Sequence, residues 1–163
     1  MDKIDETDAH VLRLLQTQGR IKRNKVAEAI GLSVPAASER MRKLEERGVV
    51  TGYHATVDAR RLGFDVTAFI RVSSASSEHY DEFIETVTSF DAVQELHSIT
   101  GDGSHILKVR VRNTSALERL LADVQRIPGV RGTQTSIVLS TQKESSVLPA
   151  EPMTLVPVSE NGQ

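Results

Sequence analysis

The sequence predicts an α+β protein with a helical first part and a second part in which strands and helices alternate. Up to Gly48, apolar residues recur at spacings of three and four, which is typical of amphipathic helices. From Val49 onward the period becomes two, and residues 64–141 then follow the order strand, helix, strand, strand, helix, strand. We therefore expect two folded parts, residues 1–62 and 63–141. Residues 142–163 should form a flexible, proline-punctuated tail, whose stretch around Leu155 and Val156 could dock on a neighbour.

The composition excludes several classes of protein. The net charge of −2 argues against a general nucleic-acid coat, but residues 1–62 hold 12 Lys and Arg against 9 Asp and Glu. This basic first part favours a DNA-facing role. The absence of cysteine excludes disulfides and thiolate metal sites. No apolar run approaches the roughly 18 residues of a membrane span, and the acidic N-terminus differs from a signal peptide. We expect a cytoplasmic protein with no membrane partner.

The first part should contain three helices. Asp5 is a suitable N-cap for a helix over residues 5–18, because its side chain can accept from a first-turn N–H. Residues 20–48 predict two further helices joined by a tight turn. Asn24 is expected to cap the first of them, and Gly31 to end it in a left-handed conformation. Ser33 is expected to cap the second helix, which ends near Gly48.

One side of this last helix should be buried and the other exposed. The buried stripe is predicted to contain Val34, Ala37, Met41 and Leu44. The stretch from Arg20 to Lys43 carries seven cations against two anions, which favours a DNA-reading helix-turn-helix over a hairpin inside an ordinary bundle. The exposed side, from its small first residues to its later cations, consists of Pro35, Ala36, Ser38, Glu39, Arg42 and Lys43.

The following segment should form a wing, and the second part a sheet. Residues 49–58 have strand formers on both sides of Gly52, so we expect a hairpin or a bent strand. The repeated strand-helix-strand unit indicates a ferredoxin-like (βαββαβ) arrangement, with both helices on one face of a four-stranded antiparallel sheet. Ala68, Ile70 and Val109 are expected to be divided between the two faces. The face without helices then needs a partner, which favours a dimer joined through its sheets.

Few residues suggest chemistry other than binding. Gly101, Asp102 and Gly103 form a turn between two predicted strands, too short for a phosphate cradle. His97 and His105 could face each other across this hairpin and hold a metal or a proton, although single histidines near a sheet edge are usually surface residues. We expect no metal, no cofactor and no catalytic residue.

With both parts in view, the chain resembles the Lrp/AsnC family of leucine-responsive and asparagine-type bacterial regulators. The resemblance covers about residues 3–141 and implies a winged helix-turn-helix that binds double-stranded DNA. It also implies homodimers that assemble into tetramers or octamers, with an amino-acid effector bound between dimers. The stretches that carry it are IDETDAHVLRLLQTQGR, VAEAIGLSVPAASERMRKLEERGVVTGYHATVD, ITGDGSHILKVRV and IPGVRGTQTSIVLS.

The family's site residues can be placed on this sequence. The resemblance adds Ser33 and Arg40 to the DNA-reading positions, although Arg40 lies near the buried stripe and could pair with a carboxylate instead. Many members have an aromatic residue and an aspartate where this chain has Gly103 and Ser104, and a serine hydroxyl cannot pair with an ammonium group as an aspartate does. The effector positions implied by the family are Gly101, Asp102, Gly103, Ser104, Thr135 and Ser136.

The sequence therefore predicts a sequence-specific DNA-binding regulator whose assembly responds to a small effector. Two alternatives stay open. One is an enzyme similar to the sirohaem decarboxylases, which share the architecture and use histidines near the hairpin, here His97 and His105. The other is an architectural protein that binds every duplex alike and has no effector.

Overall fold

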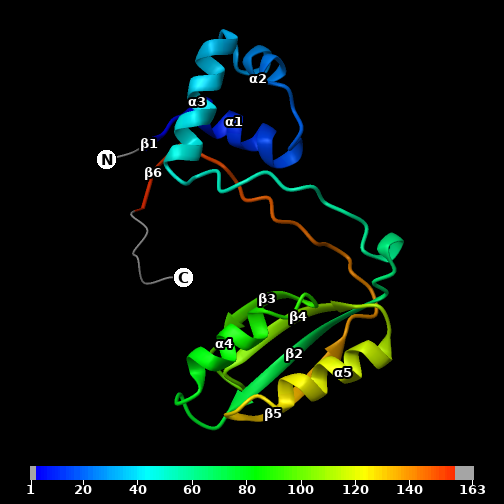
Figure 1. Ribbon diagram of the computed structural model, residues 1–163. Helices are drawn as coiled ribbons and strands as arrows, with labels where there is room; N and C mark the ends of the chain where they lie inside the picture. The colour runs from blue at the N-terminus through cyan, green and yellow to red at the C-terminus, as the bar shows by residue number, and fades with distance from the viewer. Residues whose placement is uncertain (1–2, 157–163) are drawn as a thin grey trace. The chain divides into compact units, whose positions relative to one another are not determined.

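The computed structural model describes residues 3–156, which form two compact units (Figure 1). Among these residues, one unit combines 3–56 with 144–156, and the other is Val57–Lys143. Residues 1–2 and 157–163, which include the end of the expected tail, lie outside the described residues. The division of the chain falls a few residues before the boundary expected near Leu62.

Three helices form the first unit: α1 (Glu6–Thr17), α2 (Arg23–Ile30) and α3 (Val34–Glu46). Asp5 and Asp8 form a reciprocal capping box at the start of α1, with the Asp8 N–H donating to Asp5 Oδ1 at 2.7 Å. The core contains side chains from all three helices, and its fully buried members include Val11, Val26 and Leu44. Each helix is short, so this shared apolar core supplies most of its stability.

The turn between α2 and α3 confirms two predictions and corrects two others. Gly31 adopts φ +67°, and Ser33 Oγ accepts from the Ala36 N–H at 3.4 Å. The residue that precedes α2 is Lys22, not Asn24, because the helix begins one residue before the expected cap. Val34 is 45% exposed instead of buried, since the first turn of α3 is not covered by the other helices.

The expected hairpin over residues 49–58 does not form. The N–H groups of Val49 and Val50 both donate to the Leu44 carbonyl, at 2.9 and 3.1 Å, so these residues complete the end of α3. Both valines also pack against the helical core. Residues 51–58 are exposed and have no regular secondary structure. The strand-forming composition of residues 49–58 was misleading because Val49 and Val50 belong to the helical core instead.

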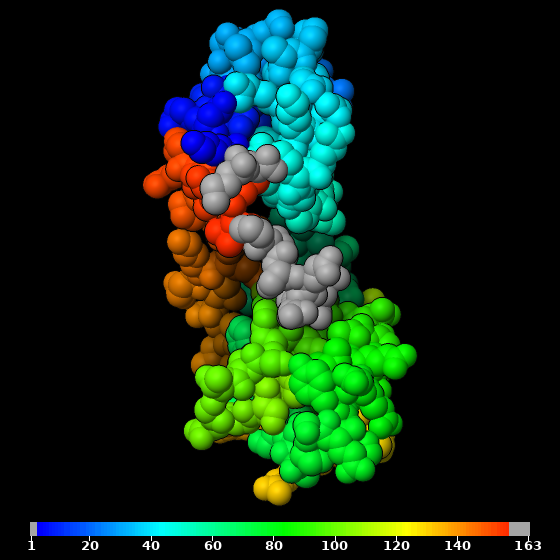
Figure 2. Space-filling view, turned by 90° about the vertical axis from the view of Figure 1, so that its left-hand side faces the viewer, coloured from blue at the N-terminus to red at the C-terminus, as the bar shows by residue number. Residues whose placement is uncertain are grey.

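Several residues of the expected tail contact the first unit. Strand β6 (Met153–Thr154) pairs antiparallel with β1 (Lys3–Ile4), and Leu155 packs against the helical core. The Gln16 side chain donates to the Leu148 carbonyl at 3.0 Å and accepts from the Leu148 N–H at 2.7 Å. Figure 2 shows the red C-terminal segment against the blue N-terminal residues.

The second unit has the ferredoxin-like arrangement that the sequence predicts. A short 3-10 turn, η1 (Arg60–Leu62), precedes the sheet. The strands have the antiparallel order β3-β4-β2-β5, and helices α4 and α5 lie on one face (Figure 1). In chain order the elements are β2 (Val66–Ser74), α4 (Tyr80–Thr88), β3 (Val93–Ser98), β4 (His105–Val111), α5 (Thr114–Gln125) and β5 (Val130–Ile137).

The strand register corrects the expected division of apolar residues. Ala68 is the register partner of Val109, so both side chains point to the same face, and Ile70 points there too. All three are fully buried in the core beneath α4 and α5. The other face is more polar: Phe69 is 39% exposed there, and Lys108 Nζ donates to Glu95 at 2.8 Å. The face without helices therefore lacks the buried-type apolar residues from which we expected a partner to be needed.

Candidate DNA interface and effector site

The outward side of α3 presents small residues first and cations later, as the sequence predicts. Arg42 and Lys43 follow Ser33 by between two and three helical turns, and both are exposed. A helix with this order can bring its first turn close to base edges while its long cations reach phosphates. We name this outward side of α3 the reader surface. Its predicted residues, all exposed or half-buried, are Ser33, Pro35, Ala36, Ser38, Glu39, Arg42 and Lys43.

The cations on this surface are paired with carboxylates of their own helix. Arg42 donates to both oxygens of Glu39, at 2.9 and 2.6 Å, and also to Glu46. Lys43 Nζ lies 3.7 Å from Glu39. The hydrogen bond from Arg42 holds the pKa of Glu39 below its usual value. Exposed pairs of this kind contribute only about 0–1 kcal/mol, so Arg42 can exchange them for phosphate or base contacts at small cost.

The Arg40 side chain bonds to carboxylates at the start of α1, the kind of pairing that the sequence left open. Its Nη1 donates to Asp5 Oδ2 at 2.7 Å and to Asp8 Oδ1 at 2.8 Å. Burial opposes ionisation of Asp5, but the Asp8 N–H and the Arg40 guanidinium outweigh it, so the pKa of Asp5 lies below its usual value. Arg40 therefore ties α3 to the start of α1.

Two residues outside the predicted set join the reader surface. Arg23, from the first turn of α2, lines a shallow hollow together with Ser38, Glu39 and Arg42 of α3. The Tyr53 hydroxyl donates to Glu45 Oε1 at 2.9 Å, and burial together with this bond raises the pKa of Tyr53 to about 12. The cation count of this stretch included Arg23, but its place beside α3 depends on how the two helices pack.

The loop between β3 and β4 is pressed tightly onto β2. Gly103 has φ +114°, and a Cβ atom added there would lie 2.7 Å from Arg71 Cγ, so a larger residue does not fit. The Ser104 N–H donates to the Val72 carbonyl at 2.8 Å, and Ser104 Oγ accepts from the Ser74 N–H at 3.2 Å. Ser104 thus helps to fix the loop, and its hydroxyl is already engaged.

One side of this loop borders a shallow hollow with charges of both signs. Arg71, Asp102 and Arg131 contribute to its lining, together with residues 132–134 of β5. Arg71 Nη1 donates to Gln134 at 3.3 Å, while its buried Nε has no hydrogen-bond partner among the described residues. We name this surface the arginine hollow. Two guanidinium groups and one carboxylate at its border match the two ends of a zwitterion.

The two predicted effector residues on the last strand lie away from the loop. Thr135 and Ser136 are the register partners of Ile70 and Phe69, in the middle of β2, and neither lines the arginine hollow. The loop instead meets the first half of β5, where Thr133 and Gln134 lie. Strand register decides this placement, and register was not determined by the sequence pattern.

The two histidines of the hairpin do not face each other. His97 is paired in register with Ile106, and His105 with Ser98, so the two rings project from opposite faces of the sheet. The His97 side chain is 59% exposed, whereas His105 is buried beneath α4. They cannot hold one metal ion together, and no cluster of three metal-ligating side chains exists among residues 3–156.

Two protein families match this arrangement. A family described as winged helix-turn-helix DNA-binding matches residues 4–51, and the Lrp/AsnC ligand binding domain matches residues 66–148. The chain belongs to the Lrp/AsnC family. Its relatives in this family include the HTH-type transcriptional regulator FL11 of Pyrococcus horikoshii, which is 34% identical over 90% of this chain and 96% of its own. The leucine-responsive regulatory protein of Escherichia coli K12 is 32% identical over 89% of this chain and 90% of its own.

Solved structures of Lrp/AsnC regulators have the same fold. The complex of the regulator NMB0573 from Neisseria meningitidis with L-methionine superimposes with a TM-score of 0.86 at 28% identity, covering 89% of this chain and 96% of that one. Escherichia coli AsnC gives 0.83 at 30% identity, covering 88% and 97%. The names of FL11 and of the leucine-responsive protein both describe regulators. In the described part of the chain, no helix is both long and apolar enough to span a lipid bilayer.

Proposed function

We propose that this Lrp/AsnC regulator binds specific sequences of double-stranded DNA by inserting α3 into the major groove. The observation that supports this most is the order of residues along the outward side of α3. Pro35, Ala36 and Ser38 leave room for the start of the helix to approach base edges closely. Arg42 and Lys43 lie further along the helix, where their long side chains can reach the DNA phosphates. In a dimer the two reading helices face half-sites separated by whole turns, roughly 34 Å each.

Glu39 gives this surface a means of selecting sequence. It lies between the small residues and the cations and accepts two hydrogen bonds from Arg42. A carboxylate in the major groove accepts from cytosine N4 and repels phosphate, so it opposes indiscriminate binding. This favours a sequence-specific regulator over the architectural alternative.

The DNA proposal is tested with the full-length protein and a duplex selected from a random pool. We expect Arg42→Ala to weaken binding roughly 5- to 150-fold and Lys43→Ala to lower the salt dependence by about one phosphate contact. Arg126→Ala is the matched control, because Arg126 forms an equivalent exposed pair with Asp123 in the other unit. Unchanged affinity and salt slope in both reader variants would remove α3 from the interface.

We also propose that the arginine hollow binds the effector, an amino acid. A carboxylate can bridge Arg71 and Arg131, and Asp102 can receive the ammonium group that Ser104 cannot. Support comes from the regulators of Neisseria meningitidis and Mycobacterium tuberculosis whose structures contain L-methionine. The protein forms homodimers that stack into tetramers or octamers, and the effector acts by binding one assembly more tightly than another.

The effector proposal is tested by calorimetric titration with each of the common amino acids, followed by sedimentation with and without those that bind. We expect Asp102→Asn to weaken binding at least tenfold, since the ammonium loses its counter-charge. Asp123→Asn, an exposed carboxylate outside the hollow, should bind as the wild type does. Equal affinity in both variants, or no binding by any amino acid, would contradict the proposal.

A further inference from the structure

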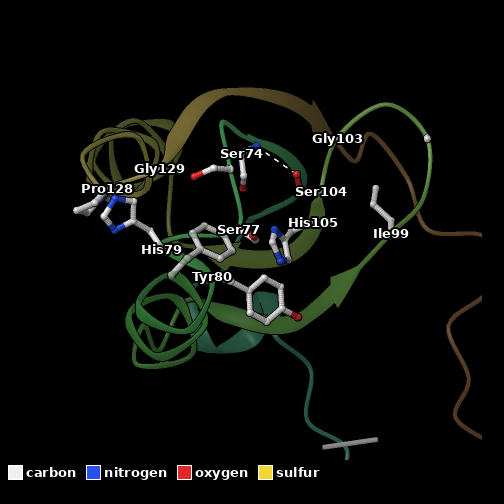
Figure 3. A pocket seen from close by; sticks show the side chains of 13 residues that line it. Ser74, Ser77, His79, Tyr80, Ile99, Gly103, Ser104, His105, Pro128 and Gly129 are labelled. Atoms are coloured by element: carbon white, nitrogen blue, oxygen red, sulfur yellow. Dashed lines mark hydrogen bonds between the residues drawn. The ribbon is translucent and has the colours of Figure 1, made fainter. Parts of the chain in front are cut away.

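A second cavity lies behind the loop between β3 and β4 (residues 99–104), which we name the glycine loop, on the side of the sheet that carries the helices. Its volume is about 360 Å³, within the range of small-molecule sites. Figure 3 shows Pro128, Gly129 and His79 on one side of it and Ile99 on the other, with Ser77 and His105 between them. We name it the imidazole cavity. It shares only Gly101 and Gly103 with the arginine hollow.

His105 is the feature that the fold alone leaves unexplained. Its side chain lines the cavity and the residue is only 2% exposed, yet neither ring nitrogen has a hydrogen-bond partner among the described residues. Its ring centroid lies 4.6 Å from that of Phe83 and 5.4 Å from that of Tyr80. A buried imidazole without partners destabilises a protein, and a leucine or phenylalanine in its place would not. Its presence is explained if a ligand supplies the missing partner.

The lining indicates the chemical class of that ligand. The described residues around the cavity include no aspartate, glutamate, lysine or arginine. Burial lowers the pKa of His105, so near neutral pH the ring is uncharged, with one N–H donor and one acceptor nitrogen. Aromatic rings form one wall, and the hydroxyl of Tyr80, which bonds to Ser98 at 2.9 Å, holds its ring beside His105. The lining residue that could carry a charge, His79, already lies 3.2 Å from Glu82, so a zwitterion would find no unpaired counter-charge among the described lining residues.

We propose that the imidazole cavity is a second ligand site, which binds a small uncharged aromatic molecule whose polar substituent bonds to His105. The ring of the ligand packs against Tyr80 and Phe83, and serine hydroxyls at the rim can meet further polar atoms. The cavity is separate from the arginine hollow, so this site requires neither the amino-acid effector nor DNA. A ligand in it would contact Gly101 and Gly103 from the side opposite the effector.

The test uses benzamide as the probe, because it is uncharged, aromatic and carries both a donor and an acceptor. We expect saturable shifts of the His105 ring signals in carbon–proton NMR spectra of the full-length protein, with a dissociation constant in the millimolar range or below. L-Leucine and benzoate should neither cause these shifts nor displace benzamide. Benzamide should also raise the melting temperature of the wild-type protein.

Two phenylalanine variants complete the experiment. His105→Phe fills the same space without unpaired nitrogens, so we expect it to melt higher than the wild type and to lose stabilisation by benzamide. His97→Phe, in the same hairpin but on the opposite face, should retain both the His105 shifts and the stabilisation. The proposal is overturned by non-saturable or absent shifts, by equal benzamide stabilisation of His105→Phe, or by competition from L-leucine.

Discussion

The reader surface of α3 and the two sites around the glycine loop are built in different ways. The reader surface consists mainly of neighbours along one helix, and its polar groups are paired among themselves, as Arg42 is with Glu39. The loop sites combine residues from three strands and several loops, and they contain buried nitrogens of Arg71 and His105 that have no partner in the described chain. A surface that is proposed to exchange its ion pairs for DNA contacts needs no buried polar atom without a partner. A site that is proposed to bind a small molecule can keep such atoms, because the ligand supplies their hydrogen-bond partners.

The largest expected effect tests whether the three helices of the first unit are stable without the C-terminal segment that packs on them. Truncation after Glu144 removes the β6 pairing, the Gln16 bonds and the packing of Leu155. We expect the first unit to lose about 3 kcal/mol of its free energy of unfolding, from one apolar side chain and several hydrogen bonds. Hydrogen exchange of α1–α3 amides measures this loss separately from the second unit.

A pair of point variants controls for the truncation. Leu155 packs against the helical core, whereas Val156 is 75% exposed. Leu155→Ala should therefore accelerate exchange in α1–α3, and Val156→Ala should leave it unchanged. Equal exchange in the truncated and full-length proteins would show that the helices are self-sufficient.

The two arginines of α3 should separate stability from DNA binding. Arg40→Ala leaves Asp8, which is only 7% exposed, without its partner, and we expect a loss of about 1–2 kcal/mol in the free energy of unfolding. Arg42→Ala removes only exposed pairs, so its stability should change by less than about 0.5 kcal/mol while its DNA affinity falls. Urea unfolding and DNA titration of both variants provide the comparison. A stable Arg40→Ala variant with weakened DNA binding would return Arg40 to the reader surface.

Glu39→Gln should strengthen DNA binding by the reader surface, whereas Arg42→Ala weakens it. The substitution removes the negative charge beside Arg42 and Lys43, so binding to a random duplex should strengthen by a few-fold, or about 0.5–1 kcal/mol. Preference for the selected duplex over the random one should fall, which competition titrations measure. Glu28→Gln on α2 removes a similar exposed pair, with Lys25, and should change neither quantity.

The smallest expected effect concerns acidic pH. Because burial keeps the pKa of His105 below the 6.5 of the unfolded chain, the unfolded state takes up the proton first as pH falls. The free energy of unfolding should therefore decrease below about pH 6.5, by at most about 1.4 kcal/mol per pH unit, until the folded pKa is reached. His105→Phe should lack this component, and His97→Phe should keep it. Identical pH profiles for the two variants would contradict the assignment.

The reader surface and the order of elements could be predicted because both depend on local periodicity. The cap at Ser33, the end of α2 at Gly31 and the βαββαβ order follow from neighbouring residues alone. The sequence did not place Arg40 with certainty, because its partners lie 32 and 35 residues away. It misplaced Ala68 and Val109, since alternation within a strand does not give the register between strands.

The same limit explains why the loop sites were only half predicted. The glycine loop was found through its turn chemistry and the family resemblance, whereas Arg71 and Arg131 come from strands that approach it only in the folded chain. His105 was noticed as a histidine near the hairpin, but its orientation beneath α4 depends on register with Ser98. The apolar residues of the tail show no helical period, so the sequence singled out the stretch around Leu155 without showing that it packs against the helical core of its own chain.

The return of residues 144–156 to the first unit has a topological consequence. The chain crosses from one unit to the other twice, once after Thr56 and once after Lys143, so the sheet unit is inserted into the helical one. A protease cut at either crossing leaves the two units joined by the other, and only both cuts release them.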